Sequence, residues 1–289
     1  MRVWLNGRLV DAAEAAVGVE DAGLQHAVGL FETMAARDGR VFRLDEHLAR
    51  MAGSAKALGL ALPDEAALRA AVDGAVADAG LPRARVRLTV TPGSVSLLRG
   101  EGQAATPTVL CVATEAVVYD QAYYDKGVTV TVAGPLANPF DPMQGHKTLA
   151  YWGRLRTLRD AAARGAAEAI WLSVTNHLAS GSVSNVLLVK DGTLLTPFAR
   201  GEEVEGALPA PVLPGVTRAA MLALAEQAGI EVKRRMLTIH DLLDADEVML
   251  TNSSWGVLPV TKVEGKWIAS GQPGTVTLQL KQAYESLDE

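Results

Sequence analysis

The chain has one cysteine, few aromatic residues and no long apolar run. Cys111 is the only cysteine among 289 residues, so an intrachain disulfide and a cysteine-rich metal site are excluded, and a reducing cytoplasm is the expected location. The apolar residues around Cys111 indicate a buried strand, where cysteine acts as a small hydrophobe and not as a nucleophile. No segment approaches the roughly 20 apolar residues that span a bilayer, and the first residues lack the apolar core of a signal peptide. We therefore expect a chain with no membrane partner.

Blocks of basic charge are also missing. The chain has 27 Lys and Arg against 33 Asp and Glu, a net charge of −6, and its basic residues are scattered. Binding to nucleic acid through phosphate neutralisation is therefore not expected. The sequence lacks GxGxxG, GxxxxGK[ST], HExxH and GxSxG motifs, and its five histidines are not paired at ligand spacing. Dinucleotide-binding, P-loop and metal-dependent enzymes are therefore disfavoured.

The order of the expected elements predicts a mixed α/β fold with many antiparallel pairs. Asn6-Gly7 between apolar runs indicates a hairpin, and Asp45 and Asp64 are candidate caps of two helices with helical apolar spacing. Further elements are expected as strands at 86–91, 108–113, 128–133, 168–173, 231–235, 247–251 and 257–263, a hairpin at 186–196, and helices at 149–164, 216–228 and 275–284.

The length favours two domains. A polar and aromatic stretch at 116–127 has weak periodicity and ends in a turn-like Asp-Lys-Gly, which is typical of a linker. The sequence thus predicts a smaller N-terminal α+β domain at 1–115 and a larger C-terminal α/β domain at 128–289.

Lysine is scarce, with eight residues against nineteen arginines. A lysine that forms a Schiff base must be held in an enclosed site. Seven of the eight lie in turns, on helices or beside polar strand residues, which is typical of solvated positions. Lys147 instead follows a loop at 138–146 and precedes an apolar helix. On position alone, Lys147 is either an exposed lysine near a helix start or an amine enclosed by an ordered loop.

Several spaced motifs surround Lys147. They are Asp21-Ala22-Gly23 followed by Gly29-Leu30-Phe31-Glu32-Thr33, then Phe42-Arg43-Leu44-Asp45-Glu46-His47-Leu48-Ala49-Arg50, then His146-Lys147-Thr148-Leu149-Ala150-Tyr151, Leu213-Pro214-Gly215-Val216-Thr217-Arg218 and Leu250-Thr251-Asn252-Ser253-Ser254-Trp255-Gly256-Val257-Leu258-Pro259-Val260. In this order they resemble the fold type IV pyridoxal-phosphate enzymes, which include branched-chain and D-amino-acid aminotransferases and aminodeoxychorismate lyases. The resemblance runs from Val3 to about Thr277.

The resemblance implies a role for each matching residue. Lys147 would bind pyridoxal 5′-phosphate as a Schiff base and then move protons as a general acid and base. Tyr151 would lie beside the ring oxygen of the cofactor, although the family's asparagine before this tyrosine is Ala150 here. Residues implied to bind the cofactor phosphate are Arg50, Val216, Thr217 and Ser253, and residues implied to line the substrate pocket are His26, Phe31 and Ser254.

Physical chemistry supports part of this assignment without the resemblance. Free backbone N–H groups at a helix N-terminus and the hydroxyl of Thr217 favour an anion. The guanidinium of Arg50 suits a phosphate because it donates two charge-assisted hydrogen bonds in one plane. The plainer alternatives are a helix-surface charge for Arg50, an ordinary helix residue for Tyr151 and an ordinary capped loop at Thr217.

One departure bears on the mechanism. The family's Glu-Gly-Ser-x-x-Asn segment places a glutamate against the pyridine nitrogen, whereas this chain has Ser180 at that position. A carboxylate there keeps the ring protonated and strongly electron-withdrawing, and a neutral hydroxyl does not do so comparably. We therefore expect Ser180 to hydrogen-bond an unprotonated nitrogen, which favours elimination or a slow reaction over rapid transamination.

The loop at 250–260 resembles aminodeoxychorismate lyases more than branched-chain enzymes. The leading hypothesis is thus a lyase that converts 4-amino-4-deoxychorismate to 4-aminobenzoate and pyruvate through Lys147. The alternative is an aminotransferase for branched-chain or D-amino acids, and a further alternative is a noncatalytic relative, which Ser180 and Ala150 would favour. The resemblance also implies a small amine or amino-acid substrate, a cofactor between the two domains and a homodimer.

Overall fold

The computed structural model describes residues 1–94 and 106–287, which form two compact units. Unit 1 contains residues 1–117 and Lys147–Ala150, and unit 2 contains residues 118–146 and 151–287. The stretch expected as a linker, 116–127, contains a short helix that belongs to unit 2. Four residues of the later half of the chain therefore pack with the N-terminal unit, an arrangement that no composition shift indicates.

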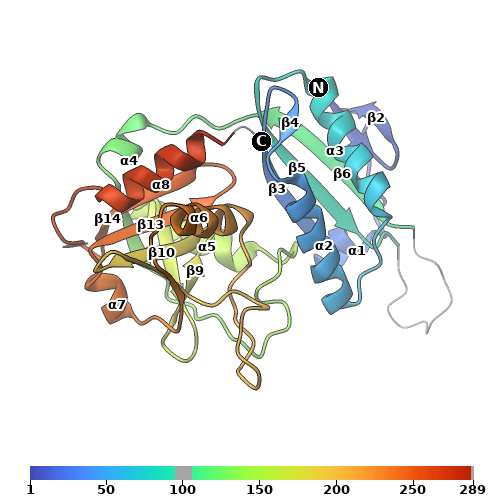
Figure 1. Ribbon diagram of the computed structural model, residues 1–289. Helices are drawn as coiled ribbons and strands as arrows, with labels where there is room; N and C mark the ends of the chain where they lie inside the picture. The colour runs from blue at the N-terminus through green and yellow to red at the C-terminus, as the bar shows by residue number, and fades with distance from the viewer. Residues whose placement is uncertain (95–105, 288–289) are drawn as a thin grey trace. The chain divides into compact units, whose positions relative to one another are not determined.

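Unit 1 is an antiparallel sheet with two helices on one face (Figure 1). Its strand order is β2-β1-β6-β5-β3-β4. The elements are β1 (Arg2–Leu5), β2 (Arg8–Asp11), α1 (Ala22–His26), β3 (Leu30–Arg37), β4 (Arg40–Val41), α2 (Leu44–Leu58), α3 (Glu65–Ala79), β5 (Arg83–Thr91) and β6 (Thr108–Glu115).

Apolar side chains alternate with polar ones along the central strands, and the apolar set forms the core of unit 1. Val86, Leu88 and Val90 of β5 are fully buried and pack against α2 and α3, as the period of a strand with one covered face requires. Cys111 lies between Leu88 and Trp4 in neighbouring strands and is fully buried. The expectation of a buried structural thiol is confirmed, and burial raises the pKa of this thiol to about 12.

Local signals predicted most of these elements. Asn6 and Gly7 both have positive φ and connect β1 to β2, as the hairpin signal indicated. Asp64 caps α3 by accepting a hydrogen bond from the backbone N–H of Ala67 at 2.7 Å. The expected cap at Asp45 is wrong, because α2 begins at Leu44 and the Asp45 carboxylate pairs with Arg69 of α3 at 2.5 Å.

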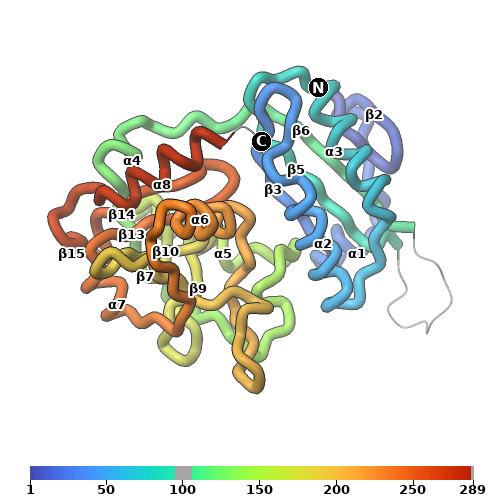
Figure 2. The backbone as a smooth tube through the Cα atoms, viewed as in Figure 1, coloured from blue at the N-terminus to red at the C-terminus, as the bar shows by residue number. Residues whose placement is uncertain are grey.

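Unit 2 is a mixed sheet with helices packed against it. Its strand order is β12-β11-β10-β13-β14-β7-β8-β9, and β15 pairs with β14. The labels of β14 and β15 lie beside each other in Figure 2. The elements are α4 (Gln121–Asp125), β7 (Val128–Val132), α5 (Trp152–Ala163), β8 (Glu168–Leu172), β9 (Leu178–Gly181), β10 (Asn185–Lys190), β11 (Thr193–Thr196), α6 (Val216–Gln227), β12 (Val232–Arg234), α7 (Ile239–Leu243), β13 (Glu247–Asn252), β14 (Gly256–Val263), β15 (Lys266–Trp267) and α8 (Thr275–Glu285).

The central strand β10 is buried on both faces. Leu187 and Val189 pack toward α6 and α8, whereas Val186 and Leu188 face a second apolar cluster that α7 helps to cover. The sequence of a strand that is covered on both sides is a continuous apolar run, and such a run predicts a strand at this position. Helices α6 and α8 lie side by side over this sheet (Figures 1 and 2).

One helix begins later than the sequence predicted. The expected start at Leu149 is wrong by three residues, because α5 begins at Trp152. The backbone N–H of Phe31 donates to Lys147 O, and that of Leu149 donates to Gly29 O, both at 3.0 Å. These bonds hold Lys147–Leu149 extended beside β3, so the segment cannot also be helical.

Candidate active site

Lys147 lies beside the first residues of β3. The backbone bonds to Gly29 and Phe31 fix its position, and the Lys147 side chain is half-buried. Its Nζ lies 4.6 Å from the centre of the Phe31 ring, within the range of a cation–π interaction. The bonds to Gly29 and Phe31 thus place this side chain beside the Phe31 ring, and its role as the Schiff-base lysine stays a prediction.

Phe31 also contacts an arginine that the sequence did not single out. The ring is 4% exposed, and the guanidinium carbon of Arg87 on β5 lies 3.9 Å from its centre. One aromatic ring thus contacts an amine and a guanidinium in the same unit. Such a pair of cationic groups suits an anionic group such as a carboxylate.

Glu32, the residue after Phe31 in β3, belongs to a buried charge cluster. Glu32 is 1% exposed and accepts from Arg50 Nε at 2.9 Å and Arg50 Nη2 at 2.5 Å. The Glu32 carboxylate also meets His47 Nδ1 at 2.8 Å. Burial alone would raise the pKa of Glu32, but Arg50 and His47 bring it down to about 2. This cluster locks the Arg50 side chain, so the phosphate role of Arg50 stays a prediction.

The pKa of His47 is lowered within the same cluster. Burial lowers its pKa most, and the charges of Arg50 and Lys147 lower it further against the opposing effect of Glu32. Its Nε2 is buried and has no hydrogen-bond partner among the described residues. Lys147 contacts Phe31, and Glu32 is the next residue of β3, so the amine and the cluster lie in the same part of unit 1.

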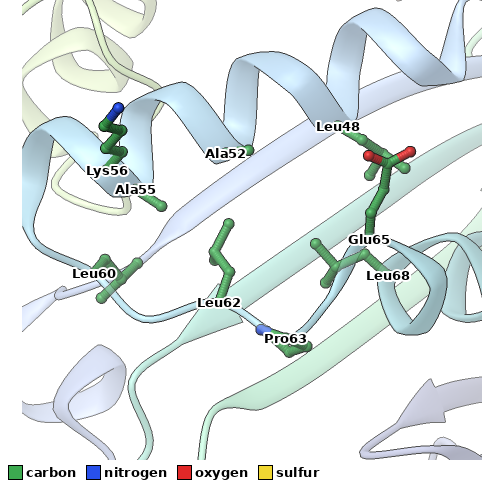
Figure 3. Close-up of a pocket in the computed structure, with 9 residues that line it drawn as sticks. All are labelled: Leu48, Ala52, Ala55, Lys56, Leu60, Leu62, Pro63, Glu65 and Leu68. Carbon is green, nitrogen blue, oxygen red and sulfur yellow. The ribbon is translucent and has the colours of Figure 1, made fainter.

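Two other features of unit 1, His26 and a cavity beside α2 and α3, involve none of the site residues described above. His26 ends α1 with an exposed side chain, and its substrate role stays a prediction. A cavity of about 280 Å³ lies beside α2, α3 and the loop between them (Figure 3). It is lined by Leu48, Ala52, Ala55, Lys56, Leu60, Leu62, Pro63, Glu65 and Leu68. None of the residues assigned from the motifs is among them.

The remaining predicted residues belong to unit 2. The clearest site is the start of α6, where Gly215 precedes Val216 and makes no side-chain cap bond. Thr217 is 3% exposed, and its Oγ1 is buried without a hydrogen-bond partner among the described residues. A buried unsatisfied hydroxyl is costly, and first-turn N–H groups at an uncapped helix N-terminus attract anions. These residues fit a phosphate.

Helix α8 provides a comparison within the same unit. It also follows a glycine, but its first-turn N–H groups are occupied, since Glu247 accepts from Val276 N at 3.0 Å and from Thr277 N at 2.7 Å. A carboxylate from β13 thus fills the position that remains available to an anion at α6. The N-terminus of α8 is thus capped by a side chain of the chain itself, and that of α6 has no side-chain cap.

Close packing fixes the backbone at the α6 site. A Cβ atom on Gly215 would lie 1.9 Å from Asn185 Oδ1, so only glycine fits there. Asn185 Nδ2 donates to Leu213 O at 2.9 Å and holds the approach to the helix. In the neighbouring strand, Thr251 is the direct partner of Asn185, and its Oγ1 is a second buried hydroxyl without a partner in the described residues.

Arg218, the last residue of its motif, has a structural role. It is 2% exposed and donates from Nη1 to Glu202 Oε1 at 2.9 Å and from Nη2 to Glu202 Oε2 at 2.7 Å. Its Nε donates to Thr196 Oγ1 at 3.1 Å. This guanidinium therefore ties α6 to the end of β11.

Ser253 and Ser254 lie in the turn between β13 and β14. Asn252 Oδ1 shapes this turn by accepting from Ser254 N at 2.8 Å and Trp255 N at 3.0 Å. Asn252 Nδ2 donates to Val183 O at 3.2 Å, which attaches the turn to the segment after β9. Both serines are half-buried, and their contacts to phosphate and substrate stay predictions.

Tyr151 and Ser180 belong to that same region. The Tyr151 hydroxyl donates to Ser182 O at 3.1 Å. Ser180 on β9 is 4% exposed and accepts from Arg154 Nη1 at 2.9 Å. Sequence reasoning missed Arg154, because an arginine on an amphipathic helix ordinarily reads as a surface charge.

Sequence similarity identifies the class of enzyme. The family model for amino-transferase class IV matches residues 29–263. The chain belongs to this family. The D-alanine aminotransferase of Bacillus licheniformis is 30% identical to it, with 99% of this chain and 96% of the relative covered. The branched-chain-amino-acid aminotransferase of Salmonella typhimurium is also 30% identical, with 99% and 92% covered.

Solved structures of class IV aminotransferases and of a lyase share the fold. The Escherichia coli branched-chain amino acid aminotransferase superposes with a TM-score of 0.89 at 27% identity, covering 99% of this chain and 94% of that one. The 4-amino-4-deoxychorismate lyase from Pseudomonas aeruginosa gives a TM-score of 0.84 at 30% identity, covering 99% and 100%. The fold type IV assignment is confirmed, and the chain is a pyridoxal-phosphate-dependent class IV enzyme.

Proposed function

We propose that this class IV enzyme transfers the amino group of a branched-chain or D-amino acid to a 2-oxo acid. The main support for this proposal is that relatives named as aminotransferases align over nearly the whole chain. This reverses the order of the two hypotheses drawn from the sequence, in which the lyase came first. The aminodeoxychorismate lyase reaction is the second candidate, favoured by the loop at 250–260 and by the likeness to a solved lyase.

Pyridoxal phosphate, when bound, supplies an electrophilic carbon for the substrate amine and an electron sink for the carbanion that follows proton loss. Val216 N–H, Thr217 Oγ1 and Ser253 hold its phosphate in this proposal. Arg50, locked by Glu32, adds a fixed positive charge. Tyr151 approaches the ring oxygen, and Ser180 meets the ring nitrogen.

Lys147 would hold the cofactor through its amine and would move the substrate's α-proton as a general acid and base. The Phe31 ring limits the directions that its Nζ can take, because the amine lies over the aromatic face. We assign the substrate carboxylate to Arg87, whose guanidinium lies over the same ring. An amine and a carboxylate on one small substrate would then be recognised by two groups of unit 1.

Borohydride reduction of the pyridoxal-phosphate-loaded protein, followed by peptide mapping, tests the assignment of Lys147. We expect the label on Lys147 and none after Lys147→Arg, with Lys126→Arg as the control because Lys126 lies in an exposed turn. Label spread over surface lysines, without amino transfer, would overturn the proposal and favour a noncatalytic relative.

A substrate assay separates the two reactions. An aminotransferase consumes a 2-oxo acid as it deaminates D-alanine or a branched-chain amino acid, and it gives no product when the 2-oxo acid is omitted. A lyase instead releases pyruvate from 4-amino-4-deoxychorismate with no 2-oxo acid present. Pyruvate release under the latter condition, with no amino transfer, would reverse our order of candidates.

The proposal also includes a homodimer and a cytoplasmic location. Exposed apolar side chains on α5 and in the preceding loop support the dimer, among them Phe140, Trp152 and Leu155. The single cysteine is a free thiol, which suits a reducing compartment. None of the helices in residues 1–94 and 106–287 combines the length and the hydropathy that a membrane crossing requires.

A further inference from the structure

Ser180 is hydrogen-bonded to a partly buried guanidinium. Arg154 Nη1 donates to Ser180 Oγ and to Gly181 O, both at 2.9 Å, and the guanidinium lies 4.9 Å from the centre of the Trp171 ring. An arginine side chain has no acceptor atom, so the Ser180 oxygen must be the acceptor in this pair. The single proton of the Ser180 hydroxyl is therefore available to another acceptor.

The buried carboxylate of Glu168 serves a different purpose. Glu168 is fully buried, and its Oε1 accepts from Ala169 N at 2.9 Å and Ser182 N at 3.0 Å. Its Oε2 accepts from Val183 N at 3.0 Å and Ser184 Oγ at 2.9 Å. These four bonds use the carboxylate to hold the turn after β9, and they leave Ser180 with Arg154 as its charged partner.

This inference rests on the proposed contact between Ser180 and the ring nitrogen of the cofactor. We propose that Arg154 is a positioning residue that keeps this nitrogen unprotonated, by fixing the Ser180 hydroxyl as a donor toward it. A protonated nitrogen would place a second positive charge one hydroxyl group away from the guanidinium, and like charges at that separation disfavour protonation. A carboxylate at position 180 would act in the opposite direction.

The consequence is a weaker electron sink than a protonated ring provides. Lys147 must then move the substrate proton with less help from the ring, so each proton transfer depends more on the placement of its Nζ. The chain thus places a guanidinium and a neutral hydroxyl where the family motif has a carboxylate. This arrangement sets the electronic state of the cofactor through residues of α5 and β9.

The test is the nitrogen NMR spectrum of the enzyme loaded with ring-¹⁵N pyridoxal phosphate, because the chemical shift of this nitrogen reports its protonation directly. We expect the shift of an unprotonated pyridine in the unaltered protein at neutral pH. The shift of a protonated pyridine would overturn the inference, whatever the variants show.

Paired variants isolate the guanidinium. In Ser180→Glu alone, the new carboxylate pairs with Arg154 and the nitrogen stays unprotonated. In Ser180→Glu with Arg154→Met, the carboxylate is free to act on the ring, and the signal moves to the protonated position. Ser180→Glu with Arg154→Lys keeps a positive charge and should retain the unprotonated signal. An unprotonated signal with Met would show that Arg154 does not set this state and would overturn the inference.

Arg156→Met is the matched control, since Arg156 lies on the same helix with a side chain that is 68% exposed. It should leave the nitrogen signal unchanged, and a changed signal would show that any loss of charge from α5 has this effect. Borohydride labelling of Lys147 on the same samples separates the two claims. A labelled Lys147 with a protonated ring refutes the inference alone, whereas an unprotonated ring without label on Lys147 refutes the proposed function.

Discussion

At the scale of single residues, the most informative side chains are those that the fold buries without satisfying. Thr217 Oγ1 is buried and has no partner among the described residues, although a hydroxyl can donate one hydrogen bond and accept two. Folding tolerates this cost where a ligand later removes it. The orphaned hydroxyl is therefore better evidence for the phosphate site than the surrounding motif is.

Replacing Thr217 by valine tests this site. Thr217→Val keeps the shape and removes the hydroxyl, so it should weaken pyridoxal-phosphate binding about 10-fold or more, as expected for a lost hydrogen bond to a charged group. The Tm of the cofactor-free protein should stay the same or rise, because an unsatisfied buried group is removed. Absorbance titration and thermal melting measure the two effects.

Thr277→Val is the control for Thr217→Val. Thr277 also has a buried, unpartnered Oγ1 near a helix start, but Glu247 already occupies the N-terminus of α8. We expect no change in cofactor affinity from this variant. Equal losses of affinity in both variants would show that helix stability, and not phosphate contact, is being measured.

The Glu32 cluster predicts the response of the protein to acid. The folded-state pKa of Glu32 is about 2, below its ordinary 4.5, so its stabilisation is fully present above pH 4.5 and is lost as the pH falls toward 2. The lowered pKa corresponds to about 3 kcal/mol as an order of magnitude. Thermal melting between pH 7 and pH 3 should therefore show a steep loss of stability at the acid end.

Glu32→Gln should make the loss of stability at low pH less steep and reduce stability by about 3 kcal/mol at neutral pH, because it removes the carboxylate charge that pairs with the Arg50 guanidinium. Glu65→Gln removes an exposed carboxylate and should reproduce the unaltered profile. If Glu32→Gln lost stability just as steeply at low pH, the loss would have to come from other carboxylates.

At the scale of elements, the approach to α6 depends on one close contact. Gly215→Ala would place its Cβ 1.9 Å from Asn185 Oδ1, so either the Asn185 side chain or the backbone must shift. We expect a loss of about 1–3 kcal/mol in the free energy of unfolding, as for overpacking elsewhere, together with weaker cofactor binding. Urea unfolding and cofactor titration measure these effects.

Gly153→Ala is the matched control, because Gly153 lies in helix α5 and a Cβ there meets nothing within 4 Å. It should leave the protein as stable or stabilise it by about 0.5–1 kcal/mol. Asn185→Ala should partly rescue Gly215→Ala by removing the clashing atom. A lack of rescue would place the damage elsewhere in the loop.

Elements with strong local signals were predictable, and those set by tertiary contacts were not. The Asp64 cap and the apolar run of β10 can be predicted because each depends only on residues that are adjacent in the sequence. The extended state of Lys147–Leu149 depends on bonds to a strand more than 100 residues earlier, so its helix-like pattern was misleading. Tertiary hydrogen bonding overrode local propensity there.

The same distinction applies to the site. Lys147, Thr217 and Ser180 were singled out because motifs carry them, and the structure adds their local geometry. Arg87, Arg154 and Glu32 were missed as functional candidates, since their partners lie in other elements. A buried arginine and a surface arginine look identical in a sequence, because burial depends on what folds over the side chain.

At the scale of the whole molecule, the oligomeric state is open to a direct test. Trp152 is 67% exposed and lies on α5 near the exposed Phe140 and Leu155 in sequence. Trp152→Glu should weaken a homodimer at least about 10-fold, because aromatic anchors dominate interface energies. Sedimentation velocity over a range of protein concentrations measures the effect.

Trp267→Glu is the control for Trp152→Glu, since Trp267 is similarly exposed on β15 and packs beside Lys262. It should leave the association unchanged. A protein that sediments as a monomer at all concentrations would refute the homodimer, and equal weakening by both substitutions would refute the assignment of α5 to the interface.

Cys111 provides a built-in reporter of one half of the molecule. The only sulfhydryl lies at the centre of the unit 1 sheet, whereas four of the five tryptophans lie in unit 2. Its reaction with a disulfide reagent under native conditions therefore measures transient opening of unit 1 alone, while fluorescence follows mainly unit 2. If the cofactor slows this reaction, the degree of slowing gives the energetic coupling between the two halves without any substitution.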